Sequence, residues 1–274
     1  MKFDMKGCCD LHIHTGPDVV ARKLDDLEMA RQAAAAGMSG FAVKSHVSST
    51  AGRAAVLQKL FPELQVYSGI TLNRQVGGIN PAAVEAAAKM GAKLLWFPTM
   101  DARAYRVENG APDAESYLSA LDEQGNISEE TLAVLKIAKQ YDMAVGTGHL
   151  GAKEAQLLVA AGHDLGLRRM CLTHVTLPVC KMSTAELKQC IAQGAVAEYS
   201  YCHILSGKCT IEYVANQIRE IGAEHVILTT DLGQANNPYP VDGLQEFCTK
   251  LLEQGISEEE LNRMTKENPF RLLL

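Results

Sequence analysis

The chain has 274 residues, of which 47 % are hydrophobic, 21 % are charged and 5 % are aromatic, a composition typical of globular proteins. Its formal net charge of −6 at pH 7 argues against a binder of nucleic acid or of an anionic membrane surface, which would need a basic face. No apolar run approaches the roughly 20 residues of a membrane span. We therefore expect a small-molecule substrate as the partner, with no nucleic acid and no membrane.

The eight cysteines have the spacing of neither a disulfide framework nor a zinc knuckle. Cys8 and Cys9 are adjacent, and no Cys-x-x-Cys pair occurs. The first seven residues contain Asp4 among lysines and no apolar stretch, so we expect no signal peptide. These features predict reduced thiols in a cytoplasmic protein.

Short apolar runs alternate with longer helical stretches along the chain. In chain order, the predicted strands cover residues 8–13, 41–44, 64–71, 93–97, 143–146, 170–173, 195–199 and 226–230. The predicted helices between them cover residues 24–36, 50–60, 81–90, 128–141, 152–161, 183–193 and 210–221. Two further helices, 243–254 and 257–266, end the chain.

This alternation of strand and helix predicts right-handed βαβ units and a parallel sheet. Eight repeats in 274 residues favour a closed (β/α)8 TIM barrel, and no Gly-x-Gly-x-x-Gly turn follows the first strand. We expect one domain over residues 1–274, with extra C-terminal helices. The long irregular segment 99–127 is typical of a functional lid or insertion.

Most of the histidines fall where predicted strands end, which is the mouth at which barrels carry their active sites. The residues with metal-ligand or catalytic chemistry at these positions are His12, His14, Lys44, His46, His149, His174 and Asp231. His12 and His14 are two residues apart on one strand, so both side chains point to the same side. Imidazoles with a carboxylate suit a divalent metal, zinc first and manganese or iron as alternatives.

Other polar residues near the predicted mouth are weaker candidates. Arg22, Arg74 and Arg103 lie in loops after strands, and guanidinium groups suit an anionic substrate, although each is also the kind of charge that a solvated loop carries. His203 follows the seventh strand and is either a substrate contact or a solvated loop residue. His163 and His225 lie away from the mouth, and we expect structural roles for them.

The order of these residues resembles that of the amidohydrolase superfamily. The resemblance covers nearly the whole chain and rests on Asp10-Leu-His-Ile-His14, His149, His174, Asp231 and the tail Glu-Asn-Pro-Phe-Arg-Leu-Leu at 267–273. Residues 230–234 and 237–243 are most similar to an uncharacterised bacterial amidohydrolase-like group. The resemblance implies metal-dependent hydrolysis of an amide, ester or lactone bond by metal-activated water, with one or two ions. It implies catalytic roles for Asp231, as general base, and for His174.

One position departs from that superfamily. Its binuclear members bridge their metals with a carboxylated lysine or a glutamate on the third or fourth strand, but the fourth strand here ends Trp96-Phe-Pro-Thr-Met-Asp101. The nearest candidate is Lys44, either as a carbamate ligand or as an ammonium that binds substrate. A third role, as the amine of a Schiff base, would make the protein a lyase or aldolase.

A second resemblance is to phosphoesterases of the polymerase-and-histidinol-phosphatase type. Residues 10–15 match their Asp-Leu-His-x-His-Thr opening, and Lys44-Ser-His46 is similar to the end of their second strand. The third strand ends Ser-Gly-Ile-Thr71 where that family has a glutamate, and Asp231-Leu-Gly replaces its Asp-x-His. A barrel that binds a ligand without catalysis is a further alternative. Related barrels often associate through their outer helices, so a homo-oligomer is also open.

Overall fold

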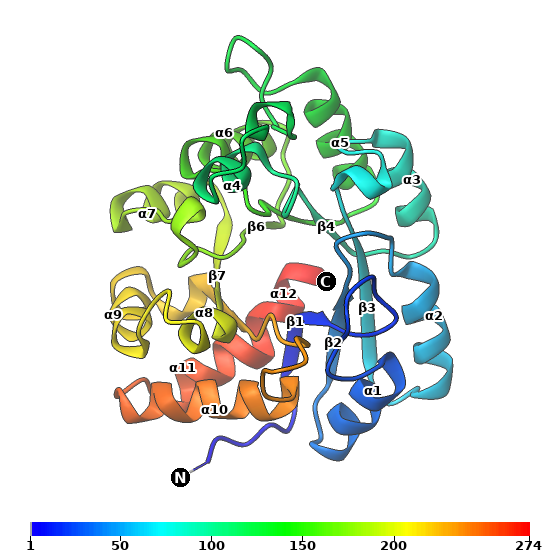
Figure 1. Cartoon of the computed structure of the whole chain (residues 1–274). Helices are drawn as coiled ribbons and strands as arrows, with labels where there is room; N and C mark the ends of the chain where they lie inside the picture. The colour runs from blue at the N-terminus through cyan, green and yellow to red at the C-terminus, as the bar shows by residue number, and fades with distance from the viewer. Residues whose placement is uncertain (1) are drawn as a thin grey trace.

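The computed structural model, which describes residues 2–274, is a ring of parallel strands surrounded by helices (Figure 1). Its eight strands pair in chain order and are β1 Cys9–His14, β2 Gly40–Lys44, β3 Gln65–Thr71, β4 Leu94–Trp96, β5 Ala144–Gly146, β6 Met170–Leu172, β7 Ala195–Ser200 and β8 Val226–Thr229. The neighbouring pairs from β1–β2 to β7–β8 are all parallel. The predicted TIM barrel is confirmed.

The ring closes between β8 and β1, next to the candidate site. The amide of His14 donates to the carbonyl of Leu232 at 2.8 Å, and the amide of Asp231 donates to the carbonyl of His12 at 2.8 Å. Below this seam the buried Asp10 carboxylate accepts from the Thr230 hydroxyl at 2.6 Å. Closure of the barrel therefore fixes His12, His14 and Asp231 relative to one another.

The α-helices follow the strands, and most of them form the outer ring around the barrel (Figure 1). They are α1 Asp26–Ala35, α2 Ala51–Leu60, α3 Pro81–Lys89, α4 Arg103–Glu108, α5 Glu129–Gln140, α6 Ala152–Asp164, α7 Thr184–Ala192, α8 Tyr201–Leu205, α9 Ile211–Ile221, α10 Pro240–Glu253, α11 Glu258–Asn262 and α12 Asn268–Leu273. Of these, α4 lies in the segment predicted to be irregular, and α8 is a short turn directly after β7. No helix within residues 2–274 has the length and apolar character needed to cross a bilayer.

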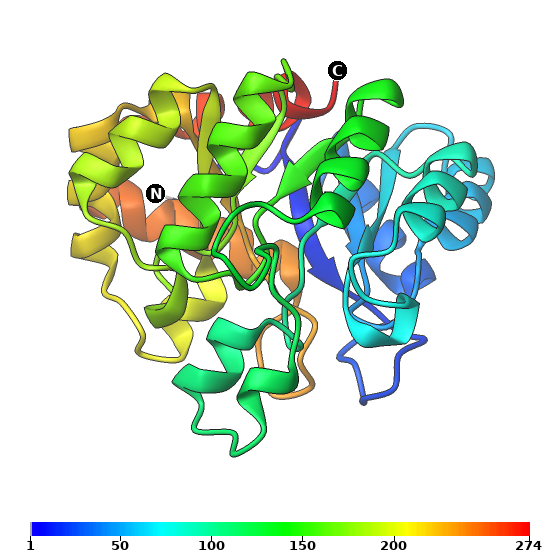
Figure 2. The same ribbon diagram turned by 90° about the horizontal axis from the view of Figure 1, so that it is seen from above.

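The C-terminal segment differs from its prediction as a single helix over 257–266. It forms α11, a π-helical turn at Arg263–Glu267 and then α12. The side-chain amide of Asn268 donates to the carbonyls of Ala223 and Val226 at 2.8 and 2.6 Å, which ties α12 to the start of β8. In Figure 2 the C-terminus lies at one end of the barrel and the loops after the strands lie at the other.

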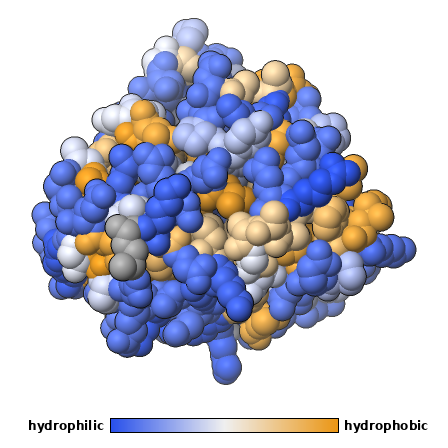
Figure 3. Space-filling model, turned by 90° about the horizontal axis from the view of Figure 1, so that it is seen from below, coloured by the Kyte–Doolittle hydropathy of each residue, from blue (hydrophilic) through white to orange (hydrophobic). Residues whose placement is uncertain are grey.

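Two apolar cores lie on opposite faces of the strands. The larger packs between barrel and helices, and the smaller fills the barrel interior with Leu11, Trp96 and Ile227, among others, and with Leu272 and Leu273 of α12. The interior below the site is therefore apolar and closed by the C-terminal helix. Hydrophilic residues cover most of the outer face shown in Figure 3, with apolar residues between them.

The long segment after β4 is held against α6 by Glu154. This carboxylate, in the first turn of α6, accepts from the Ser119 hydroxyl at 2.8 Å and from the Ala120 amide at 2.5 Å. Burial raises the pKa of Glu154, and its hydrogen bonds only partly oppose that shift.

We expect the difference in stability between wild type and Glu154→Gln to change with pH. A raised pKa means that the folded state binds the proton more tightly, so wild-type stability falls as pH rises above the ordinary value of 4.5. Gln keeps an acceptor for Ala120 without a charge. In urea unfolding, the Gln variant should be more stable relative to wild type at about pH 8 than at about pH 4.5. The same difference in the free energy of unfolding at both pH values would contradict this. Glu154→Ala should cost about 1–3 kcal/mol, because it leaves the Ala120 amide unpaired.

Candidate metal centre

Asp231 lies at the centre of the histidine cluster at the barrel mouth. Its Oδ1 is 3.2 Å from His12 Nε2 and 3.0 Å from His14 Nε2. Its Oδ2 is 3.7 Å from Nε2 of His174, which directly follows the β6 end of the barrel. One carboxylate from the β8 end therefore faces the Nε2 atoms of three histidines from two other strand ends.

Two of these residues have an unusual backbone. His174 has φ 57° and Asp231 has φ 52°, the left-handed region that residues other than glycine seldom adopt. Such strained residues concentrate at functional sites, where the surrounding structure enforces them. Here the conformation accompanies side chains that are directed toward the same point.

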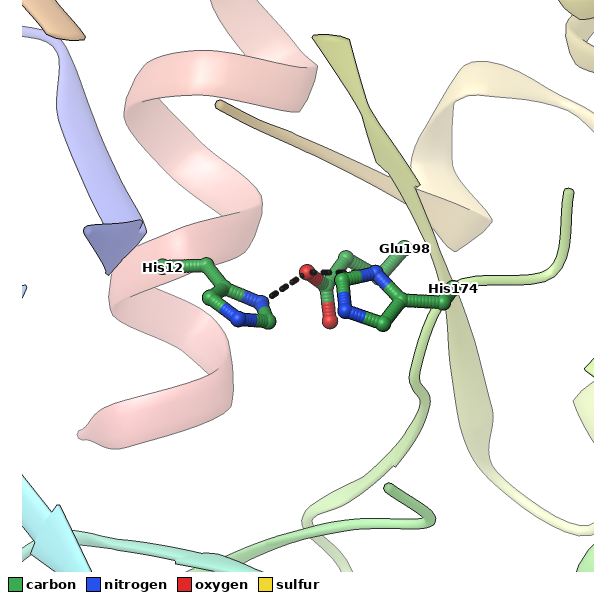
Figure 4. Close-up of side chains that lie close together, drawn as sticks. All are labelled: His12, His174 and Glu198. Atoms are coloured by element: carbon green, nitrogen blue, oxygen red, sulfur yellow. Dashed lines mark hydrogen bonds and ion pairs between the residues drawn. The ribbon is translucent and has the colours of Figure 1, made fainter. Parts of the chain in front are cut away.

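Several of the histidine rings are anchored at Nδ1, which leaves Nε2 available. His12 Nδ1 lies 2.5 Å from Glu198 Oε1, and His174 Nδ1 lies 3.0 Å from Ser200 Oγ. Figure 4 shows the two rings on either side of Glu198, which comes from β7. His203 Nδ1 lies 2.7 Å from the Thr176 hydroxyl in the same way.

Glu198 was not among the predicted site residues. The signal was present, because Glu198 is the one charged residue in the apolar run Ala-Val-Ala-Glu-Tyr of the seventh strand. Alternation along a strand places it on the same face as Val196, which packs in the barrel interior.

The donor atoms of the cluster fit a divalent metal ion. Three sets of side chains each bring their ligand atoms within 4.8 Å of one another, and they are His12 with His14 and Asp231, His12 with His174 and Glu198, and His174 with His203 and Asp231. The Nδ1 atoms of His14 and His149 are buried without a hydrogen-bond partner in the described chain. Unpartnered buried imidazoles beside a carboxylate are the arrangement that a metal ligand set requires.

Burial sets the protonation of most of these rings. It lowers the pKa of His14 and of His203 to about 4, and it lowers the pKa of His149 and His174 well below the ordinary value. Neutral imidazole is the form that binds metal. For His12, burial and Lys44 lower the pKa, but the Glu198 and Asp231 carboxylates outweigh them. The pKa of His12 is therefore raised above its ordinary value.

Lys44 is fully buried beside the cluster. Its Nζ lies 2.8 Å from His12 Nε2 and 5.0 Å from the centre of the Trp96 ring. Burial lowers the pKa of Lys44 to about 8, while the nearby carboxylates oppose the shift. The amine is therefore within reach of the candidate ligands, and it loses its proton nearer to neutral pH than an ordinary lysine does.

A cavity of about 160 Å³ opens above the cluster. Its walls include six residues predicted as ligands or contacts, which are His14, His46, His149, His174, His203 and Asp231. Tyr105 also lines it, and so do Lys208 and Gln234, which were not predicted. The His46 ring stacks on His14 with centroids 4.6 Å apart, and His149 lies 4.9 Å from the Tyr105 ring.

The structure does not bring the three predicted arginines to this cavity. Arg22 forms an ion pair with Asp18 at 2.6 Å, and Arg74 donates to the Ser116 carbonyl at 2.7 Å. Arg103 is directed toward Glu115, at 3.9 Å. Each guanidinium group lies against another loop group, and none of the three arginines lines the cavity.

Comparison with known proteins gives a family for the chain. A model described as a family of unknown function, DUF6282, matches residues 7–198. The chain belongs to this family. No curated protein matches its sequence.

Solved structures similar to the DUF6282 chain are TIM-barrel hydrolases. An amidohydrolase from Pseudomonas aeruginosa has a TM-score of 0.67 at 13 % identity, over 98 % of this chain and 95 % of that one. An organophosphorus hydrolase from Deinococcus radiodurans has a TM-score of 0.63 at 13 % identity, over 99 % and 93 %. A mutant PTE-like lactonase from Deinococcus radiodurans has a TM-score of 0.60 at 12 % identity, over 100 % and 98 %. The resemblance to amidohydrolase-type barrels is therefore confirmed at the level of the fold.

Proposed function

We propose that the protein is a metal-dependent hydrolase that cleaves an amide, ester or lactone bond of a small substrate. The observation that carries the proposal is the Asp231 carboxylate facing the Nε2 atoms of His12, His14 and His174. The amidohydrolase, organophosphorus hydrolase and lactonase among the similar structures support the same class of reaction. All eight cysteines are free, which suits the reducing cytoplasm in which we propose that it acts.

In this proposal His12, His14, Asp231 and His174 hold the ion, zinc first and manganese or iron as alternatives. His149, His46 and Lys44 are the further candidates if a second ion binds. A divalent ion held there would lower the pKa of bound water towards neutrality and would polarise the carbonyl oxygen of the substrate. Asp231 accepts the proton from the attacking water and returns it to the leaving group.

We propose two alternative roles for Lys44 in the hydrolase. As a carbamate it would add an oxygen ligand next to His12, and as an ammonium it would bind a negatively charged group of the substrate. Its lowered pKa, about 8, also favours the alternative function of a Schiff-base lyase, because a nucleophilic amine must be neutral. Trapping with borohydride in the presence of substrate separates this alternative from hydrolysis.

Metal analysis of the purified protein tests the proposed function. We expect about one or two equivalents of zinc, manganese or iron per chain, and restoration of hydrolysis when metal is added to the chelator-treated protein. A panel of small amides, esters and lactones identifies the bond. Native protein that contains no metal and binds none on titration would refute the proposal.

We propose an anionic substrate, bound by Lys208 instead of the predicted arginines. Among the described residues that line the cavity, Lys208 is the only lysine or arginine. It follows α8, and its amide donates to the His203 carbonyl at 2.9 Å, which holds this loop against the site. The small volume of the cavity, about 160 Å³, favours a substrate of few atoms.

Lys208→Met should raise KM for an anionic substrate roughly 10- to 100-fold and change kcat little, because a charge-assisted contact is worth about 1.5–3 kcal/mol. A neutral analogue of the same substrate should be unaffected. Lys188→Met, an exposed change on α7, is the matched control and should leave KM unchanged. An equal loss for charged and neutral substrates would exclude recognition of charge by Lys208.

A further inference from the structure

We infer that Glu198 is a positioning residue that fixes the tautomers of two metal-binding histidines, His12 directly and His174 through Ser200. The inference rests on the metal centre of the proposed function. Glu198 lies on β7 and is buried, with 2 % of its surface exposed. Figure 4 shows its carboxylate between the two rings.

A single oxygen of Glu198, Oε1, makes the polar contacts with the groups around it. Oε1 lies 2.5 Å from His12 Nδ1, 2.8 Å from the Thr229 hydroxyl and 3.2 Å from the Ser200 hydroxyl. Ser200 Oγ in turn lies 3.0 Å from His174 Nδ1. Two rings from different strand ends are thus connected to a single carboxylate oxygen.

An ionised carboxylate only accepts hydrogen bonds, and this sets the direction of the whole network. His12 must carry its proton on Nδ1. Ser200 gives its hydroxyl proton to Glu198, so its oxygen accepts from Nδ1 of His174. Both rings then present an unprotonated Nε2, which is the atom directed at Asp231 in each case. Outer carboxylates that orient ligand histidines in this way contribute strongly to metal affinity.

Glu198 contacts the opposite side of each ring from the nitrogen proposed to bind the metal. Glu198 meets the Nδ1 atoms of the two rings, at 2.5 and 3.9 Å, whereas Asp231 meets their Nε2 atoms. It lines the apolar space in the barrel interior with Leu11 and Trp96, and the substrate cavity above has other walls. Its effect on the reaction therefore passes through His12 and His174.

Glu198→Leu is the decisive variant, because it has a similar volume and removes the oxygen that accepts from His12 Nδ1. Without that acceptor the His12 proton moves to Nε2, where it faces the Asp231 carboxylate and blocks metal binding. We expect zinc affinity, measured by calorimetric titration of the metal-free protein, to fall roughly 10- to 100-fold. Glu154→Leu, the same change at a buried glutamate on α6, should leave the zinc affinity of the folded protein unchanged.

Nitrogen-15 NMR of the histidine rings in metal-free protein reports the tautomers and does not depend on enzymatic activity. Wild type should show the Nδ1-protonated form for His12 and His174. Ser200→Ala, which keeps Glu198, should release His174 and leave His12 unchanged, and this variant tests the network even if Glu198→Leu fails to fold.

An unaltered His12 tautomer in Glu198→Leu, or zinc affinity within twofold of wild type, would overturn the inference. The proposed function fails separately, if wild type binds no metal while its rings still show the expected tautomers.

Discussion

Replacing Asp231 with Asn should lower kcat of the proposed hydrolysis by roughly 10²- to 10⁴-fold, the usual contribution of a general base. Asn has the size of Asp but cannot accept a proton at neutral pH. It also tolerates the left-handed backbone that position 231 requires, at φ 52°, so the barrel should keep its stability. Steady-state kinetics and circular dichroism measure the two effects.

Asp142→Asn is the matched control. Asp142 has φ 54°, is exposed, and pairs with Arg169 at 2.7 Å before β5, at the opposite end of that strand from His149. It undergoes the same chemical change in the same backbone conformation, and kcat should stay within about twofold. Equal losses in both variants, or full activity in Asp231→Asn, would remove Asp231 from the role of general base.

The sequence predicted the barrel and the positions of the histidines because both follow from local patterns. Apolar runs separated by amphipathic stretches indicate parallel βαβ units, and parallel strands bring their ends to one mouth. His12, His14 and Asp231 could therefore be placed near one another without coordinates. Their mutual distances depend on how β8 and β1 join, through the bond from His14 to Leu232, and no local pattern contains that information.

The surroundings of the cluster were harder to predict for the same reason. Arg22 and Arg74 lie in the expected loops, but loop geometry directs their side chains to Asp18 and Ser116. Lys208 reaches the cavity only because α8 turns the chain back over the mouth. Glu198 was detectable as a charge in an apolar strand, yet its partners come from three other strands or their ends.

The tightest backbone approach at the closing seam is at Gly233, next to Leu232. A Cβ atom at this position would lie 1.6 Å from the carbonyl oxygen of His14, and φ is +128°. The neighbouring carbonyl cannot move away freely, because the His14 amide is bonded to Leu232 and its ring faces Asp231. A side chain here must therefore displace either the seam or the candidate ligand.

Gly233→Ala should accordingly lower the free energy of unfolding by about 4 kcal/mol or more, a size reserved for severe steric strain. Any folded fraction should also bind less than the wild-type equivalent of metal, since His14 has shifted. Gly194→Ala is the control that introduces backbone strain without a steric clash, because Gly194 has φ +93° and a Cβ atom added there would meet nothing within 4 Å. That control should cost only the backbone penalty of roughly 1–2 kcal/mol. Urea unfolding and metal analysis of both variants measure the difference, and equal stabilities would show that the seam yields without strain.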